Sequence, residues 1–349
     1  MNCGGIIGYG TYLPNYRITL ETMASAQQED LPKLFASLGV TEKTVAGYDE
    51  DAITMAVSAA EQAIITTTID RTNIGAIYVG SESHPYAVKP SAAIVGTALG
   101  IGRYYTAADI EFACKGGTAA LHAALAMVRS SLAPYALAIG CDVAQAHPND
   151  ILAYVAAAGS AAFLIGNNAN EVIATVDASH SITVDLPDFW RRAEQRYPEH
   201  TGRFTGQPAY FSIVEQLVTS ILNDNNLTTA DIDYVVFHQP NAKFVTAIAK
   251  QLGFNGSQYE TGMIVQTCGN CYSATTLLGL AAVLDQAQPG KRILVASFGS
   301  GAGGDAFIMT TTSQLPRYQQ QRTTFIKPLQ QKKYLSFLEY QRITAMRPS

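Results

Sequence analysis

Cys114 lies in the part of the sequence that most clearly suggests chemistry. The stretch AADIEFACKGGTAALHAALAMV, residues 107–128, has the pattern of a strand, a glycine turn and a helix rich in small residues. A cysteine at such a turn lies near the helix N-terminus, where unpaired N–H groups and the helix dipole favour the thiolate. The alternative is a small buried core residue, which is the ordinary role of a cysteine. This stretch alone leaves both roles equally open.

Three further polar residues occur at matched positions. Glu82 ends one predicted strand and precedes Cys114 by 32 residues, and His238 ends another and precedes Asn270 by 32 residues. Asn270 lies in residues 264–284, where the pattern strand, glycine turn and small-residue helix occurs again. Two equal spacings within the same order of elements indicate an internal duplication.

The elements that must position these residues alternate between strand and helix. This alternation predicts two α/β halves with largely parallel sheets, whose nearly continuous apolar strands need helices on both faces. Strand ends and strand-to-helix turns are the places where such sheets bind ligands. We predict an N-terminal half over residues 1–170, which carries Glu82 and Cys114, and a C-terminal half over residues 171–349, which carries His238, Asn270 and a basic C-terminal segment.

Composition excludes several classes of protein. The 349 residues are 48% hydrophobic and 15% charged, which is typical of a well-packed globular protein. The net charge of -5 gives no reason to expect nucleic-acid binding. The segment from residue 315 to the end is basic, and such a segment could hold an anionic partner or form a solvated surface.

The chain shows no pattern of secretion or membrane insertion. Its first residues lack the features of a signal peptide, and the most apolar later stretch, residues 151–166, is too short for a membrane span. The five cysteines are an odd number without framework spacing, which favours a reducing, cytoplasmic location. Cys268 and Cys271 form a lone CxxC pair without two further zinc ligands, and we interpret them as buried free thiols.

The motifs GSES, FACKGG, VFHQPNAKF, CGNCYSA and FGSGAGGDA together resemble the thiolase superfamily. Within it, the chain is most similar to the short, archaeal-type branch of the hydroxymethylglutaryl-CoA synthase family, and the similarity covers nearly the whole chain. The resemblance implies two duplicated βαβαβαββ halves packed as a layered α/β/α/β/α sandwich, and a homodimer. It implies an acyltransferase that condenses acetyl-CoA with acetoacetyl-CoA and water to 3-hydroxy-3-methylglutaryl-CoA and CoA, in the mevalonate pathway to isoprenoids. Coenzyme A thioesters would be the substrates, without another cofactor or a metal.

The resemblance also assigns the central roles. It makes Cys114 the acetyl-accepting nucleophile, Glu82 the general acid/base and His238 the group that polarises the second substrate. The chemistry agrees, because an unactivated acetyl-cysteine must lose a methyl proton before it can attack. Burial would make a neighbouring carboxylate a stronger base. A ketoacyl synthase III-like enzyme obtains its carbanion by decarboxylation and needs no such base, so Glu82 favours the synthase.

Five other residues are placed in the substrate site by resemblance. Asn270 would help to hold the acetoacetyl thioester, and Ser300 would lend a backbone N–H to the oxyanion hole. Arg203, Thr205 and Lys243 fall where the family lines its CoA and acyl site. The alternatives are a left-handed turn residue for Asn270, a surface charge for Lys243 and an ion-pair partner for Arg203.

The chain departs from the family pattern at four positions. Ala26 and Gln27 replace a Trp-Gly pair, Val155 lies where a Thr is expected, and Ala247 replaces an Arg. These changes allow an altered acyl preference or weaker CoA binding. A hypothesis of a different class is a non-catalytic thiolase-fold partner subunit, against which the complete Cys/His/Asn/Glu set argues. The short branch is associated with a thiolase and a small zinc/OB-fold protein, so the resemblance implies such a complex here.

Overall fold

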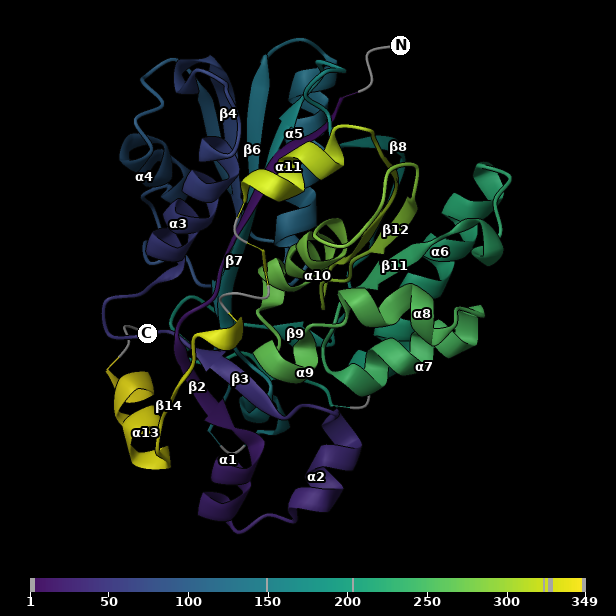
Figure 1. The fold of residues 1–349 in the computed structure, drawn as a ribbon. Coiled ribbons are helices and arrows are strands. Elements are labelled where there is room, and N and C mark those ends of the chain that lie inside the picture. Colours follow the sequence, from purple (N-terminus) through teal and green to yellow (C-terminus); the bar gives the residue numbers. More distant parts are fainter. Residues whose placement is uncertain (1–3, 149, 203, 323, 326–328, 347–349) are drawn as a thin grey trace.

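The computed structural model describes residues 4–148, 150–202, 204–322, 324–325 and 329–346. Its centre is a nine-stranded sheet in the order β11-β12-β13-β8-β1-β7-β6-β4-β5 (Figure 1). The strands from the first part of the chain are β1 (Gly5–Tyr12), β4 (Ile74–Gly80), β5 (Thr106–Ile110), β6 (Tyr135–Val143) and β7 (Ala158–Gly166). Those from the second part are β8 (Ala174–Thr183), β11 (Tyr234–Phe237), β12 (Arg292–Ala296) and β13 (Gly303–Thr311).

The strand order repeats in the two parts of the sheet. The first part contains the run β4-β6-β7-β1, and the second contains the corresponding run β11-β12-β13-β8. The two runs meet where β1 pairs with β8 through Gly5–Thr175 and Ile6–Ala174. The connection from β7 to β8 contains residue 170, where we predicted the boundary of the halves, and that boundary stays a prediction.

The sheet is mixed, so the expectation of largely parallel sheets is wrong. β4 runs parallel to β5 and β6, and β11 runs parallel to β12. The pairs β6–β7, β7–β1, β1–β8, β8–β13 and β13–β12 are antiparallel. A short connection accounts for one of these pairs, β12–β13, because antiparallel neighbours need no crossover helix. A glycine loop, residues 297–302, joins β12 directly to β13.

A second difference concerns the strand predicted at the start of residues 264–284. Those residues form a short helix, α9 (Val265–Cys268), so the described residues of the second half contain no counterpart of β5. The side-chain oxygen of Gln239 accepts the N–H groups of Ile264 at 2.9 Å and Val265 at 3.0 Å. These donors are therefore satisfied without a neighbouring strand.

Helices and sheet form five layers, as the resemblance implies. The helices α5 (Gly116–Arg129) and α10 (Thr275–Leu284) pack together in one core between the two parts of the sheet (Figure 1). The outer face of the first part packs against α3 (Ala52–Ile65) and α4 (Ser91–Ala98). The outer face of the second part packs against α6 (Phe211–Asp224) and α7 (Ala242–Leu252).

Successive side chains of a strand point to opposite faces of the sheet, so one strand can contribute to two cores. On β4, Ala76 and Tyr78 face the α5 and α10 core, whereas Ile77 and Val79 face the α3 and α4 core. The first turn of α5 lies very close to this strand. A Cβ on Gly80 would lie 2.0 Å from the carbonyl carbon of Gly116, so a side chain cannot be accommodated there.

A smaller unit lies at one end of the molecule (Figure 1). Its three-stranded sheet has the order β14-β2-β3. It consists of β2 (Tyr16–Thr19), β3 (Glu42–Val45), β14 (Lys333–Tyr334), α1 (Leu20–Gln27), α2 (Leu31–Leu38) and α13 (Phe337–Ala345). Other elements are α8 (Gly256–Tyr259), α11 (Leu315–Gln321) and the hairpin of β9 (Phe189–Trp190) and β10 (Glu199–His200).

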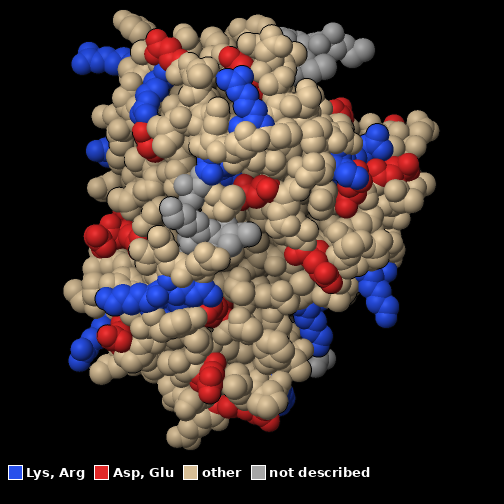
Figure 2. All heavy atoms as spheres, viewed as in Figure 1, with Lys and Arg blue, Asp and Glu red and all other residues tan. Residues whose placement is uncertain are grey.

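Two basic residues of the C-terminal segment form ion pairs with earlier parts of the chain. Arg322 forms an ion pair with Asp285 in the interior, and its guanidinium lies 3.9 Å from the centre of the Tyr9 ring. Lys332 forms an ion pair with Glu42 at 2.5 Å. Acidic and basic side chains are interspersed over the described part of the face in Figure 2. Within the described ranges, no helix has the length and apolarity needed to cross a membrane.

Candidate active site

Cys114 lies at the turn between β5 and α5, as the sequence predicts. The N–H of Lys115 donates to the carbonyl of Phe112 at 3.1 Å, and that of Gly116 donates to the carbonyl of Ala113 at 2.9 Å. Ala113 has a φ of 47°, in the left-handed region that is unfavourable for a residue with a side chain. The chain thus turns sharply into α5 and places Cys114 at the turn, with only 7% of its surface exposed.

The surroundings of Cys114 favour the thiol over the thiolate. Burial raises the pKa of Cys114 well above its ordinary value, and the negative charges of Glu82 and Asp142 raise it further. The expectation that the helix N-terminus favours the thiolate is therefore wrong for the free protein, because desolvation outweighs the helix dipole. The thiol donates to Oε1 of Glu82 at 3.4 Å, so its proton has an acceptor in place.

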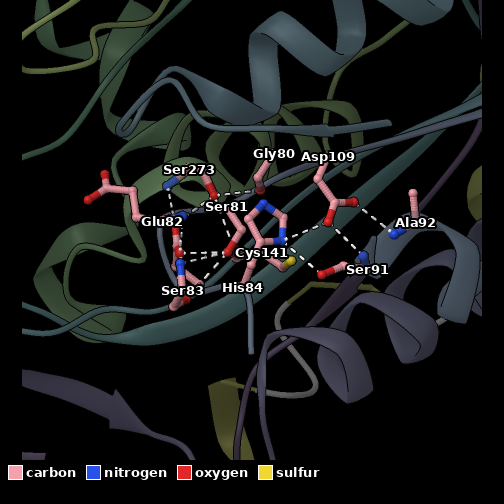
Figure 3. A network of polar contacts seen from close by, with 11 residues as sticks. Gly80, Ser81, Glu82, Ser83, His84, Ser91, Ala92, Asp109, Cys141 and Ser273 are labelled. Carbon is pink, nitrogen blue, oxygen red and sulfur yellow. Dashed lines mark hydrogen bonds and ion pairs between the residues drawn. The ribbon is translucent and has the colours of Figure 1, made fainter. Parts of the chain in front are cut away.

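Asp142, at the end of β6, fixes the backbone around Glu82. Its Oδ1 accepts the N–H of Glu82 at 2.8 Å and the hydroxyls of Ser81 at 2.9 Å and Ser83 at 2.7 Å. Its Oδ2 accepts the N–H and the hydroxyl of Ser273, at 2.9 and 2.6 Å. Figure 3 shows Ser81, Ser83 and Ser273 converging, with the Glu82 carboxylate extending away from them. Among the described residues, the Asp142 carboxylate is thus held by five hydrogen-bond donors and is not paired with a cation.

The environment of Glu82 makes it a stronger base than an ordinary glutamate. Burial raises the pKa of Glu82 to about 8, and the charge of Asp142 contributes to the rise. The hydrogen bond from Cys114 and the charge of Arg191 lower it in part. Arg191 also donates to the backbone carbonyl of Glu82 at 2.8 Å. Both the position and the proton affinity of the carboxylate are therefore set by its neighbours.

His84, two residues after Glu82, supports a helix. Its Nδ1 lies 2.8 Å from the hydroxyl of Ser91 and 3.5 Å from the carboxylate of Asp109 (Figure 3). Asp109 accepts the N–H groups of Ser91 at 2.6 Å and Ala92 at 2.9 Å, at the start of α4. This arrangement satisfies backbone donors at the N-terminus of α4, so the contacts of His84 are structural ones.

His238 follows β11 and is neutral. Its backbone N–H donates to the carbonyl of Ala296 at 2.8 Å, and its carbonyl accepts the Tyr210 hydroxyl at 2.8 Å. Burial lowers the pKa of His238 to about 3, so the imidazole carries no charge near neutral pH. Nδ1 has no hydrogen-bond partner among the described residues. The ring can therefore act as a hydrogen-bond donor or acceptor towards a substrate.

Asn270 is oriented by hydrogen bonds to its side-chain oxygen. Oδ1 accepts the N–H of Tyr272 at 3.0 Å and the hydroxyl of Thr275 at 2.8 Å. The backbone N–H of Asn270 donates to the carbonyl of Val155 at 2.7 Å. Because the oxygen is already used, the amide NH₂ group is the part of this side chain that remains for a ligand.

A cavity of about 430 Å³ brings the predicted residues together. Its lining includes Cys114, Thr205, His238, Asn270 and Ser300. Aromatic rings form much of the remaining wall, namely Phe189, Tyr210, Phe244, Tyr272 and Phe298. A mainly apolar cavity with a few converging polar groups is typical of a small-molecule site.

The other predicted residues lie outside this lining. Glu82 contacts Cys114 and borders a smaller adjoining hollow that shares Tyr272 with the cavity. Lys243 is exposed in the first turn of α7 and does not line the cavity. Arg203 lies outside the described residues.

One of the four departures from the family pattern reaches the cavity directly. Val155 lines it, whereas Ala26 and Ala247 are exposed and lie away from it. The side chain of Gln27 accepts a hydrogen bond from the hydroxyl of Tyr154, the residue before Val155. The change at residue 155 thus replaces a hydroxyl by a methyl group on the cavity wall.

Sequence reasoning missed Asp142 and Asp188. The Asp188 carboxylate accepts the N–H of Gly301 at 2.6 Å and a hydrogen bond from the Ser300 side chain. Burial raises the pKa of Asp188. Asp142 could have been found, because it ends a buried strand in the same way as Glu82. Asp188 precedes the short strand β9 and carries no comparable pattern.

Cys268 and Cys271 are buried free thiols, as interpreted from the sequence. A cluster of metal-ligating side chains is not found in the described ranges. The Cys271 sulfur lies 3.9 Å from the hydroxyl of Thr44 in the interior. These cysteines therefore belong to the packing beneath the Asn270 turn.

The geometry is suited to transfer of an acyl group to a thiol, followed by removal of a proton beside it. Cys114 can accept the acyl group, and Glu82 lies close enough to take a proton from the thiol or from a bound methyl group. His238 and Asn270 can donate hydrogen bonds to a second carbonyl compound in the same cavity.

Two family models match the chain. Residues 2–170 match the model described as hydroxymethylglutaryl-coenzyme A synthase N terminal, and residues 222–311 match 3-oxoacyl-[acyl-carrier-protein] synthase III C terminal. A hydroxymethylglutaryl-CoA synthase of Archaeoglobus fulgidus is 50% identical over 96% of this chain and 97% of its own length. The protein of that name in Methanococcus vannielii is 48% identical over 96% of both chains.

Solved structures share the fold. An HMG-CoA synthase complexed with CoA superposes with a TM-score of 0.90 at 22% identity, covering 99% of this chain and 92% of its own. MvaS in complex with 3-hydroxy-3-methylglutaryl coenzyme A gives 0.89 at 22% identity, covering 99% and 93%. FabH, a 3-oxoacyl-(acyl carrier protein) synthase III of Pseudomonas aeruginosa PAO1, gives 0.81 at 19% identity, covering 89% and 99%. The fold is thiolase-like, and the identity to the archaeal relatives over nearly the whole chain shows that it belongs to the hydroxymethylglutaryl-CoA synthase family.

Proposed function

We propose that the protein condenses acetyl-CoA with acetoacetyl-CoA and water to 3-hydroxy-3-methylglutaryl-CoA and CoA, through an acetyl thioester on Cys114. The observation that carries this proposal is the contact of 3.4 Å between the Cys114 thiol and Glu82. It places a carboxylate of raised proton affinity beside the carbon that must lose a proton. Membership of the family supports the choice of substrates.

The first step forms the acetyl-cysteine. Glu82 accepts the proton of the Cys114 thiol, and the sulfur attacks the carbonyl carbon of acetyl-CoA. The negative oxygen of the tetrahedral intermediate is stabilised by the backbone N–H groups of Cys114 and Ser300. The intermediate breaks at the bond to CoA, whose sulfur leaves with the proton that Glu82 returns.

The second step forms the new carbon–carbon bond. Glu82, again ionised, removes a proton from the methyl group of the acetyl-cysteine, and the resulting enolate attacks the keto carbon of acetoacetyl-CoA. The neutral imidazole of His238 donates a hydrogen bond to the keto oxygen, and the alkoxide formed there takes up one proton, equivalent to the one that Glu82 removed, to become the hydroxyl of the product. The amide NH₂ of Asn270 holds the acetoacetyl thioester.

The last step releases the product. Water attacks the thioester carbonyl on Cys114, with the same two N–H groups stabilising the negative oxygen. The bond to sulfur breaks, the free carboxylate of the product forms, and the thiol regains a proton. We propose that CoA is contacted by Thr205, Arg203 and Lys243. The resemblance supports all three, and the place of Thr205 on the cavity wall supports its role further.

We further infer a cytoplasmic homodimer that acts in the mevalonate pathway. The resemblance supports these points, and it alone supports a complex with a thiolase and a small zinc/OB-fold protein. A ketoacyl synthase III-like condensation is the second candidate, which the match of residues 222–311 favours. Glu82 argues against it, because a decarboxylated donor needs no base. The partner-subunit hypothesis leaves the four converging groups without a role.

The test supplies acetyl-CoA and acetoacetyl-CoA, separately and together, and follows CoA release and the mass of the product. We expect a stoichiometric release of CoA with acetyl-CoA alone, and 3-hydroxy-3-methylglutaryl-CoA with both. Cys114→Ala serves as the control and should give neither. Turnover with malonyl-CoA or malonyl carrier protein in place of acetyl-CoA would contradict the proposal.

A further inference from the structure

Lys115 and Asp305 form a buried ion pair next to the nucleophile. Nζ of Lys115 lies 3.2 Å from Oδ1 of Asp305, and the two side chains are 5% and 1% exposed. The ammonium group also lies 3.8 Å from the centre of the Phe112 ring. Removing two charges from water is costly, and the cost is offset only when pairing and hydrogen bonding are nearly complete. Such a pair therefore needs a specific set of partners.

Asp305 has those partners, and they come from several elements. Its Oδ2 accepts the hydroxyl of Thr118 on α5 at 2.8 Å, and its Oδ1 accepts the hydroxyl of Ser181 on β8 at 2.5 Å. Its backbone N–H donates to the hydroxyl of Ser297 at 3.0 Å, and Ser297 lies 2.7 Å from the hydroxyl of Thr118. His122 of α5 also lies near, with Nε2 at 3.9 Å from Oδ1. The pair is thus the centre of a network that ties α5 to β8, to β13 and to Ser297 at the start of the glycine loop.

The two residues belong to the two segments that supply the oxyanion hole. Lys115 directly follows Cys114, and Asp305 follows the glycine loop that contains Ser300. The backbones of these segments touch, because a Cβ on Gly299 would lie 2.9 Å from the backbone nitrogen of Lys115 and 2.5 Å from the carbonyl oxygen of Phe112. The glycine loop is closed on itself by the N–H of Gly299, which donates to the carbonyl of Gly303 at 2.8 Å.

The positive charge of Lys115 is taken up by Asp305. The charged groups that act on the Cys114 thiol are Glu82 and Asp142, both of which raise its pKa. A lysine beside a nucleophilic cysteine would ordinarily be expected to favour the thiolate. Here the lysine points into the network described above, so its contribution to the reaction is geometric.

We propose that the Lys115–Asp305 ion pair is a positioning device that sets the backbone N–H groups of Cys114 and Ser300 at the separation that an oxyanion requires. This inference rests on the proposed function. It predicts that every step through a tetrahedral intermediate depends on the pair, namely formation and hydrolysis of the acetyl-cysteine. Alkylation of the same thiol by iodoacetamide passes through no oxyanion and should be independent of the pair.

The test compares these two reactions of Cys114 in the full chain. Lys115→Met removes the charge and keeps a side chain of similar length, and Asp305→Asn removes the partner charge. We expect acetyl transfer from acetyl-CoA to fall about 100-fold in either variant, the loss typical of one oxyanion-hole donor. The rate of alkylation should be unchanged. Lys115→Arg keeps the charge and should retain most of the acetyl transfer, and Lys250→Met, at an exposed lysine of α7, should leave both rates unchanged.

Isotope-edited infrared spectroscopy of the acetyl-cysteine gives a second readout. In Lys115→Met the hydrogen bonds to the carbonyl oxygen of the acetyl-cysteine should be weaker, so the stretch of this carbonyl should shift to higher frequency. If Lys115→Met and Asp305→Asn do not fold, Ser297→Ala removes one hydroxyl from the network and should lower acetyl transfer without changing alkylation. Equal losses of both reactions, or undiminished acetyl transfer in a folded variant of the pair or in Ser297→Ala, would overturn the positioning role. Failure of acetyl transfer in the unchanged protein would instead contradict the proposed function on which the inference rests.

Discussion

Replacing Glu82 by Gln should stabilise the fold, and by more at high pH than at low pH. The pKa of Glu82 is raised from 4.5 to about 8, chiefly by burial. Each pKa unit corresponds to about 1.4 kcal/mol, so the ionised carboxylate lowers the free energy of unfolding by up to about 5 kcal/mol. Glutamine has a similar shape, can accept the hydrogen bond from Cys114 and carries no charge to desolvate.

The direction of this pH dependence follows from the pH at which the folded and the unfolded chain each release the Glu82 proton. Between pH 4.5 and 8 the unfolded chain has released this proton while the folded protein keeps it. The contribution of Glu82 to stability is therefore complete below pH 4.5 and is lost as the pH rises through 8. The advantage of Glu82→Gln should be about 2 kcal/mol at pH 6 and should level off near about 5 kcal/mol at pH 9.

Urea unfolding of both proteins at pH 6 and pH 9 measures this difference. Glu194→Gln, at an exposed glutamate between β9 and β10, controls for the loss of one negative charge. An advantage of Glu82→Gln that is equal at the two pH values would refute the reasoning, and so would a variant less stable than the parent at pH 9. Either result would mean that Glu82 is not held in an environment that disfavours its charge.

Three further predictions concern the same groups and the C-terminal segment. The initial rate of condensation should fall about tenfold per pH unit below pH 8, because Glu82 must be ionised to act as a base; a flat profile from pH 6 to 8 would contradict this. Asp142→Asn removes one of the causes of the raised pKa, so the same profile should move to lower pH, and a move to higher pH would exclude that role. Arg322→Met should lower the free energy of unfolding by about 3–5 kcal/mol, measured by urea unfolding, since it leaves Asp285 buried and unpaired. An unchanged midpoint would show that this ion pair does not hold the segment.

The sequence was sufficient to predict the parts of the site that depend on local pattern. The strand, turn and helix around Cys114 follow from alternation, glycines and small residues, and the equal spacing of Glu82 and His238 from their turns indicated the repeated strand order. Three of the predicted binding residues, Thr205, Asn270 and Ser300, line the same cavity as Cys114 and His238.

What could not be predicted depends on contacts between distant segments. The Asp142–Ser273 contact joins residues separated by 131 positions, and no local pattern in either segment indicates the other. The expectation of a thiolate at Cys114 rested on the helix N-terminus alone. Burial and the charge of Glu82 act in the opposite direction, because both raise the pKa of the thiol. The apolar residues at the start of 264–284 fit a strand or a helix equally well, and Gln239 decides for the helix by accepting two backbone N–H groups.

The central claim is that Cys114 accepts the acetyl group and Glu82 then removes a proton from it. Mass spectrometry of the Glu82→Ala variant after mixing with acetyl-CoA, followed by addition of acetoacetyl-CoA, tests both parts in one experiment. We expect an acetyl group on the peptide that contains Cys114, formed more slowly than in the parent because Glu82 no longer takes the thiol proton, and no 3-hydroxy-3-methylglutaryl-CoA after the second addition. Formation of the product by the variant, or acetylation at a residue other than Cys114, would contradict the claim.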